Sequence, residues 1–140
     1  MSRALNDLSS QMRPKACELL ARLTERAVMV MIVDTLRTPA EHAANLANGT
    51  SKTPVSKHLP RILRHAKFSN ADDADRSDAM DICPYEIYAL HGPDKLQWNS
   101  DDPAWRIIGE EAEKLGLRWG GRWKVPHDPG HVELPTVLIS

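Results

Sequence analysis

The fold of this chain is decided by Trp119 to Glu133, WGGRWKVPHDPGHVE, where carboxylate, imidazole and indole side chains crowd together with glycines. Asp128 and His131 stand three positions apart, separated by proline and glycine, so a compact turn must present both side chains. A metal ligand next to a general base requires such closeness. The alternative is a tryptophan-rich hairpin with a solvated tip, and a matching cluster upstream would decide between the two.

Three segments have the sequence pattern of amphipathic helices. Apolar residues recur at helical spacing over residues 10–26, and again between Asp102 and Gly116. Residues 38–41, Thr-Pro-Ala-Glu, have the order of an N-cap, a proline at N1 and a capping-box acid. A helix is therefore expected from residue 39 to Asn48.

Short apolar runs between these helices are predicted as strands. Residues 27–33 are rich in β-branched side chains, which favours a buried strand, and residues 79–82 form a second, with 85–90 continuing or pairing with it. Residues 117–119 and 131–134 are expected to be further strands. Because strands and helices are mixed without βαβ regularity, we expect an α+β fold, a small antiparallel sheet flanked by helices, with the site in a cleft on the sheet.

Length and composition indicate one globular domain spanning residues 1–140. The formal net charge of -1 removes the electrostatic case for a nucleic-acid partner, and the chain has no run of about twenty apolar residues that would predict a membrane span. The polar start of the chain has no hydrophobic signal core, so synthesis in the cytoplasm is expected. Cys17 and Cys83 are expected to be buried free thiols, and the protein a monomer.

Three short segments carry the residue types of a catalytic zinc site. They are Ser56-Lys57-His58, Ala79-Met80-Asp81 and the segment from Asp128 to Glu133. Catalytic zinc sites take three protein ligands from His, Asp, Glu or Cys and leave the fourth position to water. The sequence has six histidines but neither H-E-x-x-H nor C-x-x-C, so the commonest zinc signatures are absent.

Over roughly residues 28–134 these segments resemble the zinc D-Ala-D-Ala carboxypeptidases and L-alanyl-D-glutamate endopeptidases, which cut peptidoglycan stem peptides. The family pattern is S-x-H-x-x-G-x-A-x-D, followed far downstream by a carboxylate, two residues and H-[aromatic or aliphatic]-E. The resemblance implies that His58, Asp81 and His131 bind one zinc ion and that Asp128 is the catalytic carboxylate. An aspartate ahead of the final histidine is more similar to the phage endolysin branch.

The resemblance extends to residues around these ligands. Arg37, in the sequence Leu-Arg-Thr after an apolar strand, is similar to the family's Y-R-[ST] segment, and its donors suit a substrate carboxylate or the developing oxyanion. Ser56 is expected to take part in substrate binding. Glu133 is expected to support a ligand rather than react.

One departure from the family pattern lies between the first two ligands. About six residues usually separate them, whereas Leu59 to Met80 make 22 here, and Ser77 occupies the family's glycine position. His65 falls inside this insertion and is the alternative first ligand, but the local context of Ser56 favours His58. A loop inserted between two ligands need not move either one if its ends stay close.

The acidic part of the insertion, residues 70–78, has three interpretations: a solvated loop, a lid or a second cation site. Asp73-x-Asp75-x-Ser77 resembles the start of a calcium loop, but an aspartate replaces the glycine at position six and Pro84 stands at position twelve, which excludes an EF-hand. A looser calcium site is the alternative. Because the insertion is long and polar, we expect it to be the most mobile part of the fold.

Together these residues predict a zinc metallopeptidase acting on peptidoglycan stem peptides, as an L-alanyl-D-glutamate endopeptidase of phage-lysin type. Two neutral imidazoles and one carboxylate leave an open zinc site that lowers the pKa of a bound water towards ~7, and Asp128 would take its proton. The alternatives are a D-Ala-D-Ala carboxypeptidase and a zinc-containing cell-wall-binding module that does not hydrolyse. Retention of Asp128 argues against the module, because a pure binder needs no base.

Overall fold

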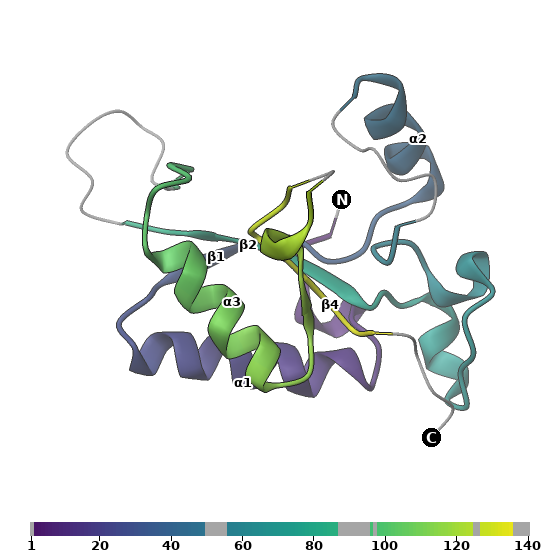
Figure 1. Ribbon diagram of the computed structural model, residues 1–140. Coiled ribbons are helices and arrows are strands. Elements are labelled where there is room, and N and C mark those ends of the chain that lie inside the picture. Colours follow the sequence, from purple (N-terminus) through teal and green to yellow (C-terminus); the bar gives the residue numbers. More distant parts are fainter. Residues whose placement is uncertain (1, 50–55, 87–95, 97, 125–126, 136–140) are drawn as a thin grey trace.

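The computed structural model describes residues 2–49, 56–86, 96, 98–124 and 127–135 (Figure 1). Its longer elements, in chain order, are α1 (Met12–Glu25), β1 (Val30–Asp34), α2 (Pro39–Ala47), β2 (Ala79–Pro84), α3 (Ala104–Lys114), β3 (Arg118–Trp119) and β4 (His131–Glu133). Short 3-10 helices lie between them: η1 (Leu5–Asp7), η2 (Arg61–Arg64), η3 (Ala71–Asp75) and η4 (Gly120–Arg122).

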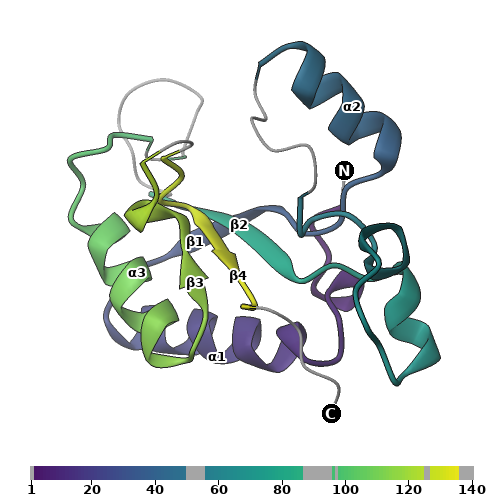
Figure 2. The ribbon, with the colours of Figure 1, turned by 45° about the vertical axis from the view of Figure 1, so that its right-hand side comes forward.

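The strands form one antiparallel sheet in the order β1-β2-β4-β3. Helices α1 and α3 lie together on one side of the sheet, whereas α2 stands apart from both (Figures 1 and 2). This arrangement confirms the expected α+β fold with a small antiparallel sheet flanked by helices. In the described part of the chain, no helix has the length and apolar character needed to cross a membrane.

Side-chain alternation along β2 and β4 separates the core from the opposite face of the sheet. Met80 and Ile82 of β2 and Val132 of β4 are buried in the core. The helices contribute the buried residues Met12, Ala16, Leu19, Leu23, Trp105, Ile108 and Ala112. Because neighbours along a strand point to opposite faces, Asp81 and His131 are directed away from this core. These two residues are paired directly across the β2–β4 ladder.

Most elements begin and end close to their expected positions. The capping box of α2 is present: the Thr38 hydroxyl accepts the backbone N–H of Glu41, and the Glu41 carboxylate accepts the backbone N–H of Thr38. Strand β1 begins three residues later than expected, because Ala27 adopts a positive φ of 60° in the turn that follows α1. That turn breaks the extended backbone that the apolar run predicted.

Two smaller expectations turn out differently. Of the predicted strand 85–90, Tyr85 forms an isolated bridge, and residues 87–90 lie outside the described residues. Cys17 and Cys83 are not joined in a disulfide, as expected, but Cys17 is exposed and only Cys83 is buried. Cys17 is exposed because it lies on the outer surface of α1, away from the buried face of that helix.

The insertion between the first two predicted ligands is anchored by a buried ionic network. Arg61 is 1% exposed and donates from Nε and Nη2 to the two carboxylate oxygens of Asp78, each at 2.8 Å. Arg64 donates to the same carboxylate at 2.6 Å, and the hydroxyl of Ser9, just before α1, donates to it at 2.5 Å. Part of the polar sequence that indicated a solvated loop is therefore paired inside the protein, whereas Asn70, Asp72 and Asp75 are exposed.

The acidic segment of the insertion also takes part in this anchor. Asp73 is buried, and its carboxylate accepts hydrogen bonds from the backbone N–H and the hydroxyl of Ser10 at 2.9 and 2.6 Å. Its charge is opposed by Arg76 at 3.6 Å and Arg61 at 3.9 Å. Within the residues that the structure describes, the acidic segment forms no group of three metal-ligating side chains, so the calcium alternative has no structural support.

Candidate metal and catalytic site

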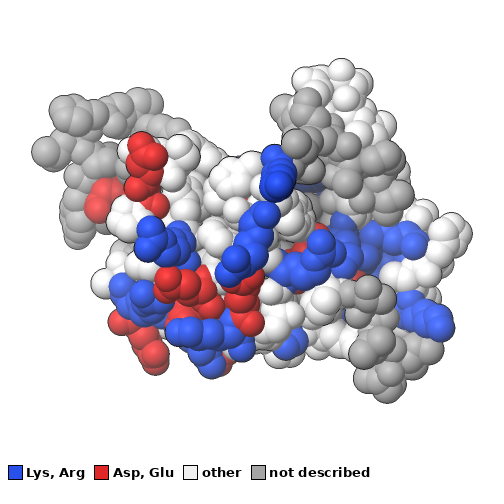
Figure 3. Space-filling view, in the orientation of Figure 1, with Lys and Arg blue, Asp and Glu red and all other residues white. Residues whose placement is uncertain are grey.

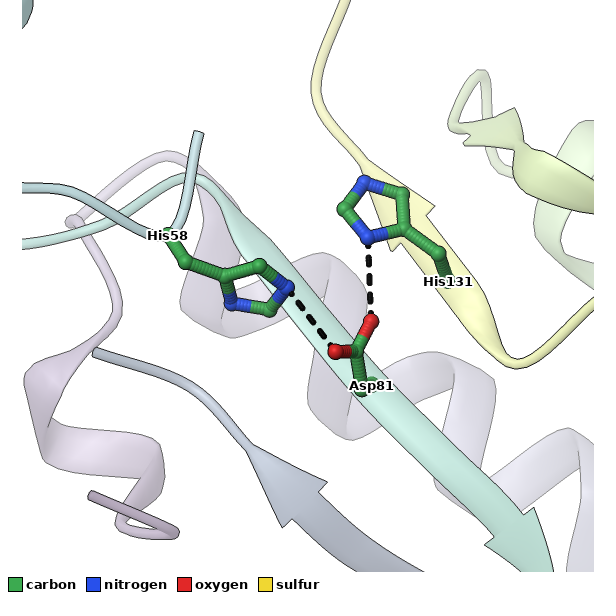
Figure 4. Close-up of side chains that lie close together, drawn as sticks. All are labelled: His58, Asp81 and His131. Atoms are coloured by element: carbon green, nitrogen blue, oxygen red, sulfur yellow. Dashed lines mark hydrogen bonds and ion pairs between the residues drawn. The ribbon is translucent and has the colours of Figure 1, made fainter. Parts of the chain in front are cut away.

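His58, Asp81 and His131 come together on the face of the sheet opposite the core (Figure 4). Asp81 lies on β2 and His131 on β4, and His58 reaches them from the loop before η2. One potential ligand atom from each residue lies within 4.8 Å of the other two. The two histidine rings meet edge to face, with centroids 5.1 Å apart. The structure thus brings together the three residues that the sequence assigned to a metal ion.

The orientation of His58 is set by the backbone at the end of β1. Its Nδ1 lies 2.9 Å from the carbonyl oxygen of Thr35, and because a carbonyl only accepts, Nδ1 carries the hydrogen and Nε2 the lone pair. Nε2 lies 3.1 Å from Oδ2 of Asp81, yet it is buried without a hydrogen-bond partner. A buried nitrogen lone pair aimed at a carboxylate is the arrangement expected where a cation lies between them.

His131 is oriented in the same way by a carboxylate. Its Nε2 lies 2.8 Å from Oε1 of Glu133 and its Nδ1 lies 2.9 Å from Oδ1 of Asp81, and because carboxylates only accept, each ring nitrogen donates to its neighbour when no metal ion is bound. Glu133 is itself held by Lys57, whose Nζ lies 3.0 Å from Oε2, and by Arg118 at 3.5 Å. This is the contact that the predicted supporting role of Glu133 requires.

The charges of the cluster favour a cation. Burial, the largest single effect, lowers the pKa of His131, but the hydrogen bonds to Asp81 and Glu133 outweigh it and raise that pKa to about 10. Burial likewise opposes ionisation of Asp81, but His58 and His131 outweigh it and hold the pKa of Asp81 well below its ordinary value. Two imidazole nitrogens and a carboxylate oxygen are the donor set of catalytic zinc sites. The residues therefore fit a divalent metal ion.

Asp128 lies beside this cluster, in the compact turn that the sequence predicted. Its backbone N–H donates to the carbonyl of Gly120, and its carbonyl accepts from the N–H of His131, both at 3.1 Å. A Cβ at position 120 would lie 2.2 Å from the Asp128 carbonyl oxygen, so the close approach requires glycine. Burial first, and the charge of Asp81 second, raise the pKa of Asp128. A half-buried carboxyl group with raised proton affinity is suited to proton transfer.

Arg37 and Ser56 also lie next to the candidate metal ligands. The backbone N–H of Arg37 donates to the carbonyl of His58 at 2.9 Å, and its Nη2 lies 3.9 Å from Oδ2 of Asp81. The hydroxyl of Ser56 accepts the backbone N–H of His58 at 3.1 Å. Ser56 therefore shapes the turn that carries His58, and its predicted contact with substrate stays a prediction.

The remaining histidine and tryptophan candidates differ in their distance from the cluster. His65 is exposed, has a positive φ of 55°, and is not part of the group of ligands, so His58 is the better first ligand. His127 is exposed, and its ring contacts the carbonyl of Gly121 at 3.1 Å. Trp123 packs against His131, with ring centroids 5.0 Å apart, so its ring forms part of the wall of the site.

Two buried residues near Arg37 were given no role by the sequence. Asp34, at the end of β1, accepts hydrogen bonds from Nε and Nη2 of Arg37 at 3.1 and 2.7 Å. His42 of α2 lies 3.4 Å from Nη1 of the same arginine. The available signal was the spacing: a carboxylate three residues before an arginine at a strand end, and a histidine one turn into the next helix.

Comparisons with known proteins identify the family to which the chain is similar. Residues 76–134 match the family described as D-alanyl-D-alanine carboxypeptidase. The chain is 32% identical over 122 residues to the L-alanyl-D-glutamate peptidase of Escherichia phage T5. This match covers 74% of this chain and 73% of the phage protein. The fold matches the L-Ala D-Glu endopeptidase ChiX of Serratia marcescens with a TM-score of 0.60 and 20% identity, over 94% of this chain and 83% of that one. The chain therefore belongs to the peptidase family that includes D-alanyl-D-alanine carboxypeptidases and L-alanyl-D-glutamate peptidases.

Proposed function

We propose that this chain is a zinc-dependent endopeptidase that cuts the L-alanyl-D-glutamate bond of peptidoglycan stem peptides. The observation that carries the proposal is the position of Asp128 beside the cluster of His58, Asp81 and His131. Three ligands alone would serve a binding module, whereas the adjoining carboxyl group with raised pKa provides a base. The likeness to the phage T5 peptidase favours the endopeptidase over the carboxypeptidase.

Each residue of the site has a role in this reaction. His58 through Nε2, Asp81 through its carboxylate and His131 through Nδ1 would hold a zinc ion, which would supply Lewis-acid catalysis. Asp128 takes a proton from the attacking water and passes it to the leaving amine. Its raised pKa aids this exchange, because a base is most effective when its pKa approaches the working pH. Glu133 keeps His131 in the tautomer that presents Nδ1.

The substrate in this proposal is an acidic peptide of the cell wall. Arg37 binds one of its carboxylates, and Ser56 lies at the edge of the same site, beside His58. Figure 3 shows acidic side chains mixed with basic ones over α3 and α1, whereas most charged side chains to their right are Lys or Arg. Basic surface of this kind attracts anionic substrates. The enzyme carries one zinc ion per monomer and acts on the wall after synthesis in the cytoplasm.

Fragments released from purified peptidoglycan test the proposal. Mass spectrometry should show glycan strands that keep L-alanine and soluble peptides that begin with D-glutamate. Loss of one D-alanine per stem would instead identify a D-Ala-D-Ala carboxypeptidase. Binding to the wall without any release would identify the non-hydrolytic module, and the Asp128→Asn variant serves as the matched inactive control.

A further inference from the structure

Arg37 is held from two sides by buried neighbours. Its Nε and Nη2 donate to one oxygen, Oδ2 of Asp34, at 3.1 and 2.7 Å, and its Nη1 donates to Nδ1 of His42 at 3.4 Å. Asp34 is 2% exposed and His42 4% exposed, so water does not compete for these contacts. Arginine only donates, which makes Nδ1 of His42 the acceptor.

These contacts leave one edge of the guanidinium group for a ligand. Of its five N–H donors, Asp34 takes two and His42 one, so among the described residues one donor on each of Nη1 and Nη2 has no hydrogen-bond acceptor. Two parallel donors match the two oxygens of a carboxylate. Because Nη2 lies 3.9 Å from Oδ2 of Asp81, the guanidinium group adjoins the metal cluster, and 11% of the Arg37 side chain remains exposed.

The carboxylate of Asp34, which holds this arginine, has one oxygen in an unfavourable environment. Oδ1 of Asp34 is buried and has no hydrogen-bond partner among the described residues. The nearest histidine nitrogen, Nδ1 of His58, is 3.8 Å from Oδ2 and donates to the carbonyl of Thr35 instead. A buried carboxylate oxygen without a partner is destabilising and calls for an explanation. The contact between Asp34 and Arg37 supplies one.

We propose that Asp34 and His42 are positioning residues, which orient Arg37 so that its free edge binds the carboxylate next to the scissile bond. The inference rests on the proposed function. When D-glutamate is joined to the next residue through its side chain, its α-carboxylate stays free beside the bond to L-alanine. The site therefore distinguishes this acid from the corresponding carboxamide, and Asp34 is a determinant of that specificity.

Two synthetic peptides test this inference on the zinc-loaded enzyme. Both are N-acetyl-L-alanyl-γ-D-glutamyl-L-lysine amide, one with the α-carboxylate of glutamate and the other with a carboxamide. The enzymes compared are the parent, Asp34→Asn, Arg37→Lys, the double variant, and the exposed control Asp101→Asn. Zinc content and circular dichroism are recorded for each, and calorimetry measures the affinity for the released product, γ-D-glutamyl-L-lysine amide, in both its acid and its amide form.

The parent should prefer the acid peptide in kcat/KM, and Asp34→Asn and Arg37→Lys should each lower kcat/KM for it roughly 10- to 100-fold, the range of one charged hydrogen-bond contact. Turnover of the amide peptide should change less than about threefold. The kcat/KM of the double variant for the acid peptide should be no lower than that of the less active single variant. Affinity for the acid product should fall in parallel. Equal losses on both peptides, or losses that multiply in the double variant, would show a structural role and overturn the inference.

The other outcomes separate this inference from the proposed function. A parent enzyme that cleaves neither peptide and releases nothing from peptidoglycan would sink both together. If Asp34→Asn loses zinc or its fold, His42 decides the question: His42→Asn keeps an acceptor at the Nδ1 position, and His42→Leu does not. The acid preference should survive in the first variant and fall at least fivefold in the second. Equal preference in the two variants would overturn the positioning role.

Discussion

Replacement of Arg61 by methionine should destabilise the protein strongly, even though Arg61 lies in an insertion. Its buried guanidinium group donates to both oxygens of Asp78 at 2.8 Å, to Gln11 at 2.7 Å and to Ser9 at 3.1 Å. Methionine has a similar length and keeps the apolar contacts, but it leaves Asp78 as a buried carboxylate with fewer partners. Breaking a buried ion pair by removing one partner typically costs about 3–5 kcal/mol.

The lower end of this range is expected, because Asp78 keeps two of its donors. Arg64 still donates to it at 2.6 Å and the hydroxyl of Ser9 at 2.5 Å. A loss of about 3 kcal/mol corresponds to a fall in Tm of roughly 6–12 °C for a domain of this size. Such a loss is a large fraction of the total free energy of unfolding of most domains.

Urea unfolding followed by circular dichroism measures the effect. A chelator in all samples keeps metal binding from adding to the stability of the native state. The matched control is Arg22→Met, which removes an exposed ion pair with Glu18 on α1 and should cost less than about 0.5 kcal/mol. If Arg61→Met and Arg22→Met unfold at the same urea concentration, the insertion is not anchored by Arg61 and the argument fails.

Four further outcomes are expected. Arginine and serine hydrogen bonds outweigh burial and lower the pKa of Asp78, so the stability it provides is complete above pH ~4 and is lost as pH falls through its folded pKa; Asp78→Asn should flatten the acid limb of a stability–pH curve. Metal analysis after dialysis should find about one zinc in the parent and in His65→Ala but none in His58→Ala, and zinc retained in the latter would exclude His58 as a ligand. Asp128→Asn should keep zinc and lower turnover at least ~10²-fold, and lysis at the parental rate would exclude it as the base. The amides of Arg76, Ser77 and Asp78, which donate to backbone carbonyls, should be protected from hydrogen exchange without added calcium, whereas free exchange there would support a mobile insertion.

The grouping of His58, Asp81 and His131 could be predicted because their three segments resemble a family pattern, and the larger elements could be predicted because their signals are local. The capping box of α2 is contained in residues 38–41, and the alternation that puts Val132 in the core sends His131 to the opposite face. The contacts of Arg61 with Ser9 and Asp78 join residues 52 and 17 positions apart, and no spacing rule records which charges will pair. Polar composition in a long segment predicts a solvated loop, so the buried network was missed for a physical reason: composition does not show whether a charge has a partner.

The insertion leaves His58 and Asp81 close together because both of its ends are fixed at one point beside β1. The carbonyl of Thr35 accepts from Nδ1 of His58 at 2.9 Å and from the hydroxyl of Ser77 at 2.7 Å, and the N–H of Asp78 donates to the carbonyl of Lys57 at 3.0 Å. The chain therefore leaves and re-enters the site at neighbouring positions. Lengthening a closed loop from about six to 22 residues costs only about 1 kcal/mol. Glycine, which the family pattern has at position 77, has no hydroxyl to donate to Thr35, so Ser77 adds a hydrogen bond that holds the end of the insertion in place.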